Sequence, residues 1–187
     1  MKNILIVFGS RFGNSKEIAA EIAKIAEEAG TKVDVIDLKE TKRKDWPSVD
    51  NYDGVIVGSG VKIMKWTKQP LAFLKKNKNQ LNKKTLGLFA TAAFALVDLE
   101  KAKLDYGETI AKDVGVQPKI HDAFGPVMDF SEDSNLGALN KGILKLAAMG
   151  IRDETGLEID TNGYNDLRDW DQIKAFAKNF VDLVKKE

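Results

Sequence analysis

Short apolar runs alternate with helical periodicities along this chain, and this alternation constrains the fold more than any other feature. Residues 4–8 form a continuous run of β-forming apolar residues, typical of a strand buried on both faces of a parallel sheet. Apolar residues then recur at spacings of three and four from Ile18 to Ala29, which indicates a helix with one buried face. Because the two patterns keep alternating, the sequence predicts an α/β fold, with one parallel sheet covered by helices on both faces.

The remaining elements are predicted from the same two patterns. Four further strands are expected, at residues 33–38, 54–59, 85–91 and 116–124. Further helices are expected from about residue 70, over residues 96–113, over residues 136–146 and from about residue 169. No repeat or long linker interrupts the chain. We therefore expect a single domain over residues 1–187, with an extended segment at about 125–165 between the fifth strand and the last helix.

Cysteine is absent from the sequence, and His121 is its one histidine. These two facts exclude disulfides, thiolate metal sites and multi-histidine metal sites, so any redox chemistry needs a bound cofactor. The formal net charge of +1 argues against a nucleic-acid-binding protein. The apolar run at the N-terminus is too short for a membrane span or a secretion signal, so we expect a cytoplasmic protein without stable membrane insertion.

In an open α/β sheet the ligand binds beyond the carboxyl ends of the strands. Three loops of this chain follow such strand ends and are candidates for the binding site. The first loop, residues 9–15, leads into the N-terminus of a helix, where free N–H groups and the helix dipole favour an anion. Its small polar side chains suit phosphate oxygens, although Asn14 and Glu17 could instead form a capping box. The loop matches neither Walker A nor GxGxxG, but Asp37 after the second strand keeps a nicotinamide cofactor as a weaker alternative.

The second and third loops suit a flat aromatic ligand. Residues 58–67 combine glycines with apolar side chains, and Trp66 could either stack on a ring or pack in the core. Residues 91–95 are small and apolar, and Phe94 could form a second wall or belong to the core. Together the three loops predict a site for a flat ring that carries a phosphate.

Two stretches of the chain, ILIVFGSRFGNSKEIA and YDGVIVGSGVKIMKW, resemble the flavodoxin family. Within this family the chain is most similar to the flavodoxin-like menaquinone-dependent protoporphyrinogen dehydrogenases, because the LAFLKKN segment and the closing DWDQIKAFA helix also match. The resemblance implies a flavodoxin-like, doubly wound sheet of five parallel strands in the order 2-1-3-4-5. It also implies FMN (flavin mononucleotide) as the cofactor.

The same resemblance implies which residues bind FMN. The phosphate would be surrounded by residues of the first loop, namely Ser10, Arg11, Phe12, Gly13, Asn14 and Ser15. The isoalloxazine ring would lie along the second loop, at Ser59, Gly60, Val61 and Lys62. The pyrimidine edge of the ring would face the third loop, at Thr91, Ala92, Ala93 and Phe94. The chain departs from the family at Phe12, where small polar residues are common, and at Ile63-Met64, where an aromatic residue and glycine are common. Trp66 is therefore the candidate for ring stacking.

Two functions are compatible with such an FMN site, and a third is weaker. The first, which we favour, is a soluble, low-potential electron carrier, in which FMN supplies the electrons and no side chain is catalytic. The second is a protoporphyrinogen IX dehydrogenase that passes electrons to a quinone. The third is a quinone reductase that uses a nicotinamide donor.

Charge is distributed unevenly along the chain. Residues 60–84 contain eight lysines and no acidic residue, whereas residues 150–171 contain seven acidic residues and two arginines. A lysine-rich rim beside the flavin suits acidic redox partners, so we expect ferredoxin-like proteins or ferredoxin-linked oxidoreductases as partners. Alternatively, these lysines could bind membrane lipid or porphyrin carboxylates, or simply form a solvated surface. We also expect Lys62 to stabilise the anionic reduced flavin and to raise the potential of that couple. The sequence does not indicate an oligomeric state.

Overall fold

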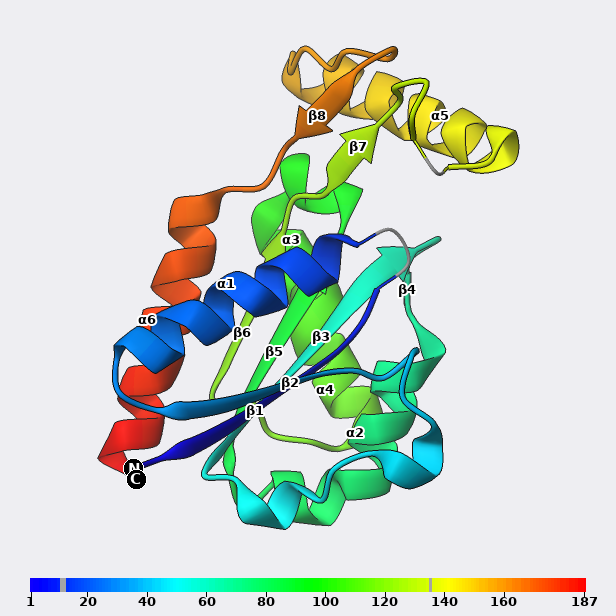
Figure 1. Ribbon diagram of the computed structural model, residues 1–187. Helices are drawn as coiled ribbons and strands as arrows, with labels where there is room; N and C mark the ends of the chain where they lie inside the picture. Colours follow the sequence, from blue (N-terminus) through cyan, green and yellow to red (C-terminus); the bar gives the residue numbers. More distant parts are fainter. Residues whose placement is uncertain (11–12, 135) are drawn as a thin grey trace.

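The computed structural model describes residues 1–10, 13–134 and 136–187 and shows a sheet between two layers of helices (Figure 1). The sheet contains five parallel strands, β1 (Asn3–Gly9), β2 (Lys32–Asp37), β3 (Gly54–Lys62), β5 (Thr85–Thr91) and β6 (Ile120–Phe124). They lie in the order β2-β1-β3-β5-β6. The additional strand β4 (Lys65–Trp66) pairs antiparallel with β3 alone. The predicted order 2-1-3-4-5 of the parallel strands is therefore confirmed.

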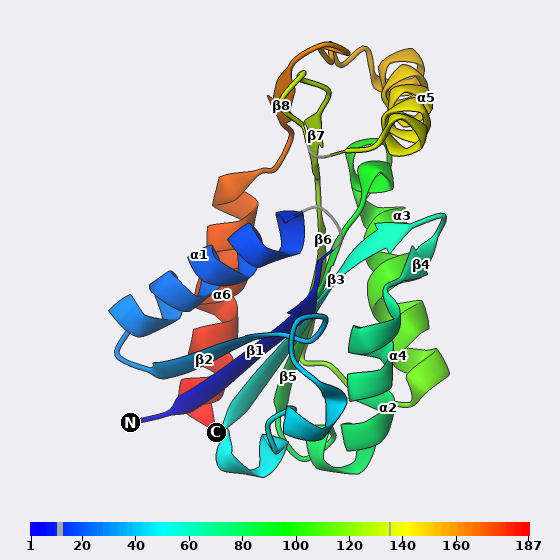
Figure 2. The same cartoon turned by 45° about the vertical axis from the view of Figure 1, so that its right-hand side comes forward.

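Helices cover both faces of the sheet (Figure 2). On one face lie α1 (Asn14–Glu28) and α6 (Trp170–Lys186), which pack against each other. On the other face lie α2 (Lys68–Leu81), α3 (Leu99–Lys103) and α4 (Thr109–Val114). Two short 3-10 turns, Arg43–Asp45 and Val49–Asn51, lie between β2 and β3.

Strand β1 is buried as its apolar run predicts. Ile4 and Ile6 pack with α1 and α6, whereas Leu5 and Val7 pack on the opposite side of the sheet, and all four side chains are fully buried. Each such side chain contributes about 1.5–3 kcal/mol when it is removed from water, so β1 is central to the core. Strand β2 lies at the edge of the sheet and is partly exposed.

The helix predicted over residues 96–113 is interrupted. A 3-10 turn (Ala93–Leu96) precedes α3, and a π-helical turn (Leu104–Glu108) separates α3 from α4. At this turn the backbone of Gly107 packs so closely on the ring of His121 that a side chain at position 107 would not fit. His121 is therefore part of the packing between β6 and the π-helical turn, and it does not line the cavity described below.

The segment at about 125–165 rises beyond the carboxyl ends of the strands, as Figure 1 shows. Strand β7 (Val127–Asp129) pairs antiparallel with β8 (Tyr164–Asp166), and α5 (Ala138–Thr155) lies between them in the chain. The helix predicted at residues 136–146 is thus present but longer, whereas the two short strands were not predicted. Within the described residues, no helix is long and apolar enough to cross a membrane.

The N-termini of α1 and α6 begin in different ways. Asp169 caps α6, because its carboxylate accepts hydrogen bonds from the backbone N–H groups of Asp171 and Gln172. The capping box that Asn14 and Glu17 could have formed is absent. Gly13 is the N-cap residue, at a left-handed φ of 88°, and no side chain of the described residues caps the helix. The side chains of Asn14 and Glu17 instead contact the segment after β6, as described below.

Candidate functional site

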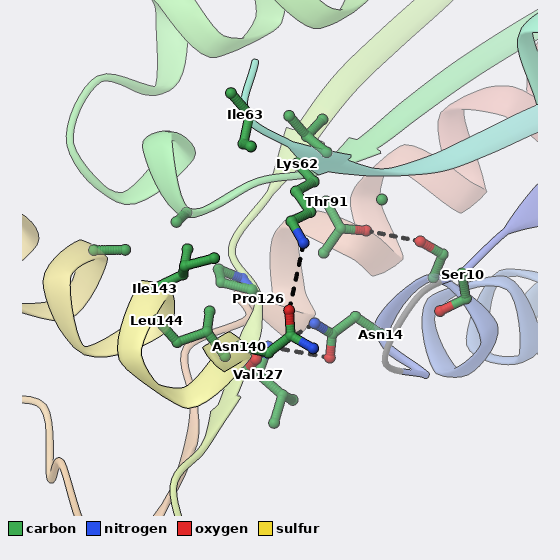
Figure 3. Close-up of a pocket in the computed structure, with 15 residues that line it drawn as sticks. Ser10, Asn14, Lys62, Ile63, Thr91, Pro126, Val127, Asn140, Ile143 and Leu144 are labelled. Carbon is green, nitrogen blue, oxygen red and sulfur yellow. Dashed lines mark hydrogen bonds between the residues drawn. The ribbon is translucent and has the colours of Figure 1, made fainter. Parts of the chain in front are cut away.

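A cavity of about 180 Å³ lies at the carboxyl ends of β1, β3 and β5, between the sheet and α5 (Figure 3). A buried water molecule needs only about 10–15 Å³ by this kind of measure, so the space suits a ligand rather than a few waters. All three predicted loops contribute to its lining, through Ser10, Asn14, Ser15, Gly60, Val61, Lys62, Thr91 and Ala93. The cavity thus lies at the position where the topological rule for open α/β sheets predicts a ligand.

One end of the cavity is polar and suits an anion. The hydroxyl of Ser10 is buried and has no hydrogen-bond partner among residues 1–10, 13–134 and 136–187. Leaving such a group unpaired is unfavourable, and an oxygen atom of a ligand would satisfy it. The same loop leads into the N-terminus of α1, where the helix dipole favours negative charge. Nearby, the hydroxyls of Ser15 and Thr91 are 3.2 Å apart and hydrogen-bond to each other.

The other end of the cavity is formed by α5 and is largely apolar. Asn140, Ile143, Leu144 and Ala147 recur at helical spacing and face the cavity together. Figure 3 shows Ile143 and Leu144 pointing in from α5, opposite Lys62 and Ile63. The amino group of Lys62 donates to Oδ1 of Asn140 at 3.4 Å and so joins the second loop to α5.

Sequence reasoning missed this wall of the cavity. The topological rule predicts a ligand site at the loops that directly follow the strands. Helix α5 is not one of these loops, because it belongs to the long segment after the last strand of the sheet. The spacing of its residues contained a signal, because positions 140, 143, 144 and 147 form one helical face. That signal indicates a largely apolar helix face without saying what the face covers, and in the structure this face is only partly buried.

Asn14 links the first loop to the segment after β6. Its side-chain Oδ1 accepts a hydrogen bond from the backbone N–H of Val127 at 3.2 Å, and its Nδ2 donates to the carbonyl of Val127 at 3.4 Å. Asn14 also lines the cavity, as does Val127. The amide thus orients the backbone that forms one side of the cavity, a role distinct from the predicted contact with phosphate.

A second link is formed by Arg168, whose side chain is only 2% exposed. Its Nε and Nη2 each donate to the carboxylate of Asp166 at 2.7 Å, and Nη1 lies 2.7 Å from Oε2 of Glu17 on α1. The guanidinium also lies over the ring of Trp170, 4.4 Å from the ring centroid. Hydrogen bonding to Arg168 lowers the pKa of Asp166 below its usual value. Arg168 therefore anchors β8 to α1 through a buried charge.

Several predicted residues do not line the cavity. Trp66 is 4% exposed and belongs to the core beside α2, and Phe94 packs against the same core. Ala92 is buried, and Gly13 acts as the N-cap of α1. Ser59 is buried too, but it supports the second loop, because its hydroxyl donates to the carbonyl of Gly60 at 3.0 Å and accepts from the N–H of Thr67 at 2.9 Å. Arg11 and Phe12 lie outside the described residues.

A doubly wound α/β sheet with a cavity at the carboxyl ends of its central strands defines a class of proteins that bind ligands at this position. Within that class, residues 5–155 match the family model described as a flavodoxin domain. Because the match covers most of the chain, this protein belongs to the flavodoxin family. Its members are flavin binders, typically of FMN.

Individual relatives agree with this assignment. The chain is 24% identical over 190 residues to the protoporphyrinogen IX dehydrogenase [quinone] of Escherichia coli (strain K12), covering 97% of this chain and 96% of the relative. A solved flavodoxin from the domain Archaea superposes with a TM-score of 0.54 at 14% identity, over 98% of this chain and 99% of the other. Rubredoxin oxygen:oxidoreductase from Desulfovibrio gigas gives a TM-score of 0.60 at 14% identity, but the chain matches only 37% of that longer protein. The structural matches support the fold.

Proposed function

We propose that this protein binds FMN in the cavity and acts as an electron carrier. The observation that carries the proposal is the buried hydroxyl of Ser10 at the polar end, beside the N-terminus of α1, which has no hydrogen-bond partner within the part of the chain that the structure describes. A phosphate monoester would accept from Ser10 and interact favourably with the helix dipole. When bound, FMN would supply the redox chemistry, and the side chains around it would hold it and exclude water.

The residues of this chain would then have separate tasks. Ser10 and Ser15 would contact the phosphate, with Thr91 orienting the hydroxyl of Ser15. The backbone at Gly60, held by Ser59, would face the ring, and Lys62 would bring a positive charge near it. Electron transfer in this arrangement requires no acid, base or nucleophile from the protein, consistent with the absence of cysteine and the position of His121.

A second candidate function is the oxidation of protoporphyrinogen IX with transfer of electrons to a quinone. Two observations favour it: the similarity to the dehydrogenases extends over 97% of the chain, and α5 gives the cavity an apolar wall at Ile143, Leu144 and Ala147. An apolar substrate could enter between Ile143, Leu144 and the ring. We rank this function second because relatives 24% identical share a fold more often than a substrate.

Cofactor binding is tested first, by fluorescence titration of the apoprotein with FMN and with riboflavin. Ser10→Ala is expected to weaken FMN binding about tenfold or more, because a hydrogen bond to a charged group contributes about 1.5–3 kcal/mol. Riboflavin, which lacks the phosphate, should bind both proteins equally. Ser48→Ala is the matched control, because Ser48 is an exposed serine that precedes the 3-10 turn Val49–Asn51 and does not line the cavity. Equal loss of FMN and riboflavin affinity in Ser10→Ala would contradict the placement of the phosphate.

The two functions are then separated with the FMN-loaded protein. It is mixed with protoporphyrinogen and menaquinone, and porphyrin formation is followed by fluorescence. Multiple turnovers would establish the dehydrogenase and overturn the electron carrier. Reversible one-electron cycling with a chemical reductant, without porphyrin turnover, is the result we expect.

A further inference from the structure

The β3–β4 hairpin has an unusual turn. Because Lys62 pairs with Lys65, the turn consists of Ile63 and Met64 alone, with φ angles of 49° and 59°. Two-residue turns with both residues left-handed normally contain Asn-Gly or Gly-Gly, since other side chains are strained there. Left-handed φ costs roughly 1–2 kcal/mol for each ordinary L-residue, and a β-branched residue such as isoleucine is a clear outlier.

These two side chains gain little from burial in return. Ile63 is 76% exposed and Met64 is 58% exposed, although the sulfur of Met64 accepts a hydrogen bond from the hydroxyl of Tyr106. A strained turn that displays two large apolar side chains to solvent does not serve the stability of the fold. Observed strain of this kind points to a functional contact.

Lysines surround this turn. Lys65 and Lys68 are exposed beside it, Lys62 precedes it, and Lys75 and Lys76 continue the positive charge along α2. No acidic residue occurs between Asp53 and Asp98 in the sequence to offset them. Because the whole chain carries only +1, this positive field is local to the hairpin and α2.

We propose that this surface, defined as Lys62, Ile63, Met64, Lys65 and Lys68 and called the hairpin surface below, docks an acidic electron-transfer protein. The proposal rests on the proposed electron-carrier function. Lys62 and Ile63 belong to both the hairpin surface and the cavity lining, so a partner seated there would lie against the mouth of the cavity. A small apolar centre with a charged rim suits a weak complex that forms by electrostatic attraction and dissociates quickly.

The direction of α2 favours a protein over a lipid bilayer as the partner. Figure 2 shows α2 leading away from the hairpin along the side of the sheet. Lys75 and Lys76 come later in α2 than Lys68, so they are farther along the helix from the turn. A flat bilayer in contact with the turn would not contact those lysines. A rounded acidic protein that buries about 800 Å² on each side could contact the hairpin and the first turns of α2 together.

The test measures electron transfer between the reduced, FMN-loaded protein and two downhill acceptors of opposite charge. One electron leaves the reduced flavin and converts Cu(II) to Cu(I) in plastocyanin, an acidic protein, or Fe(III) to Fe(II) in cytochrome c, a basic protein. The second-order rate constant is measured by stopped flow as ionic strength rises from about 10 mM to about 500 mM, which shortens the screening length from about 30 Å to under 10 Å. We expect the rate with plastocyanin to fall steeply and the rate with cytochrome c to stay level or rise.

Matched variants locate the effect. The double variant Lys65→Glu and Lys68→Glu should lower the plastocyanin rate at least tenfold at low ionic strength and leave FMN affinity unchanged. The control, Lys24→Glu and Lys178→Glu, changes the net charge equally on exposed positions of α1 and α6, on the opposite face of the sheet. Its rate should stay within about twofold of the parent protein. Equal effects of the two double variants would overturn the proposal.

Two further measurements separate the alternatives. Binding of plastocyanin to the FMN-free protein is followed by NMR titration with the same variants, so docking is tested even if FMN does not bind and the proposed function fails. Co-sedimentation with phosphatidylserine-rich vesicles tests the bilayer. Vesicle binding that is abolished by Lys65→Glu and Lys68→Glu, with no binding of plastocyanin, would replace the acidic protein by a membrane and refute the proposal.

Discussion

Arg168 offers the sharpest test of how the segment after β6 is attached to the rest of the fold. The guanidinium is buried, donates two 2.7 Å hydrogen bonds to Asp166, and lies 2.7 Å from the carboxylate of Glu17. Replacement by methionine keeps much of the side-chain length and removes the charge. Removing one partner of a fully buried ion pair costs about 3–5 kcal/mol, because the other partner is left unpaired.

The expected magnitude lies below that range, because both carboxylates can regain water. The side chain of Glu17 is 56% exposed and that of Asp166 is 30% exposed. We therefore expect Arg168→Met to lower the free energy of unfolding by about 2–3 kcal/mol. For a domain of this size that corresponds to a fall in Tm of about 5–10 °C.

Thermal unfolding followed by circular dichroism measures this effect. Arg152→Met is the matched control, since Arg152 is an exposed arginine of α5 that contacts only Asp153 among the ion pairs found. Its Tm should change by less than about 2 °C, as exposed ion pairs contribute little. If Arg168→Met were as mild as the control, the buried link between β8 and α1 would not stabilise the protein and our reading of it would be refuted.

Further predictions concern the turn, the cavity and a helix cap. Ile63→Asn should raise the free energy of unfolding by about 1 kcal/mol, because asparagine tolerates a left-handed φ. Denaturant titration measures the free energy of unfolding, and an unchanged or lower value would show that the turn is not strained. Lys62→Ala should lower the reduction potential of the couple that yields the anionic reduced flavin by about 20–60 mV. This shift is equivalent to about 0.5–1.4 kcal/mol, as expected for a solvent-screened charge. An unchanged midpoint potential in a redox titration would exclude the role assigned to Lys62. Asp169→Ala should lower stability by about 1 kcal/mol through loss of the α6 cap, whereas the exposed neighbour Asp171 should tolerate alanine. The free energy of unfolding should also fall below about pH 4. The pKa of Asp166 is lowered in the folded state, so the stability that its carboxylate contributes is lost as the carboxylate becomes protonated. In acid denaturation, Arg168→Met should show a smaller fall than the parent protein.

Much of the fold could be predicted because its signals are local. The apolar run of β1 and the spacing of the buried residues in α1 and α6 are each contained in fewer than twenty consecutive residues. The interruption at Leu104–Glu108 could not be predicted in this way. At this turn Gly107 packs closely on His121, a contact between residues that only the folded sheet brings together.

The site was predictable to the extent that it depends on loops after strands. Ser10, Gly60 and Thr91 follow from the position of their strands, and all three line the cavity. Trp66 could not be assigned from sequence, because an aromatic residue near a glycine-rich loop is equally consistent with a stacking role and with the core. The antiparallel pairing of β4 with β3 decides its position, since it turns Trp66 towards the core beside α2.

The two ends of the cavity therefore have different origins, and the two candidate functions depend on different ends. The polar end is built from β1, β5 and the first turn of α1, and an FMN phosphate could bind there whatever covers the ring. The apolar end depends on α5, which Lys62 contacts directly through Asn140. The segment that carries α5 is attached to the rest of the fold by the hydrogen bonds of Asn14 to Val127 on β7 and by the anchor of β8 at Arg168. Weakening the contacts of Arg168 should leave phosphate binding intact but expose the flavin ring to solvent. Arg168→Met should thus retain the preference for FMN over riboflavin measured for the parent protein, while any porphyrin turnover that depends on the α5 wall should be lost. Loss of the FMN preference in this variant would show that the two ends are not independent.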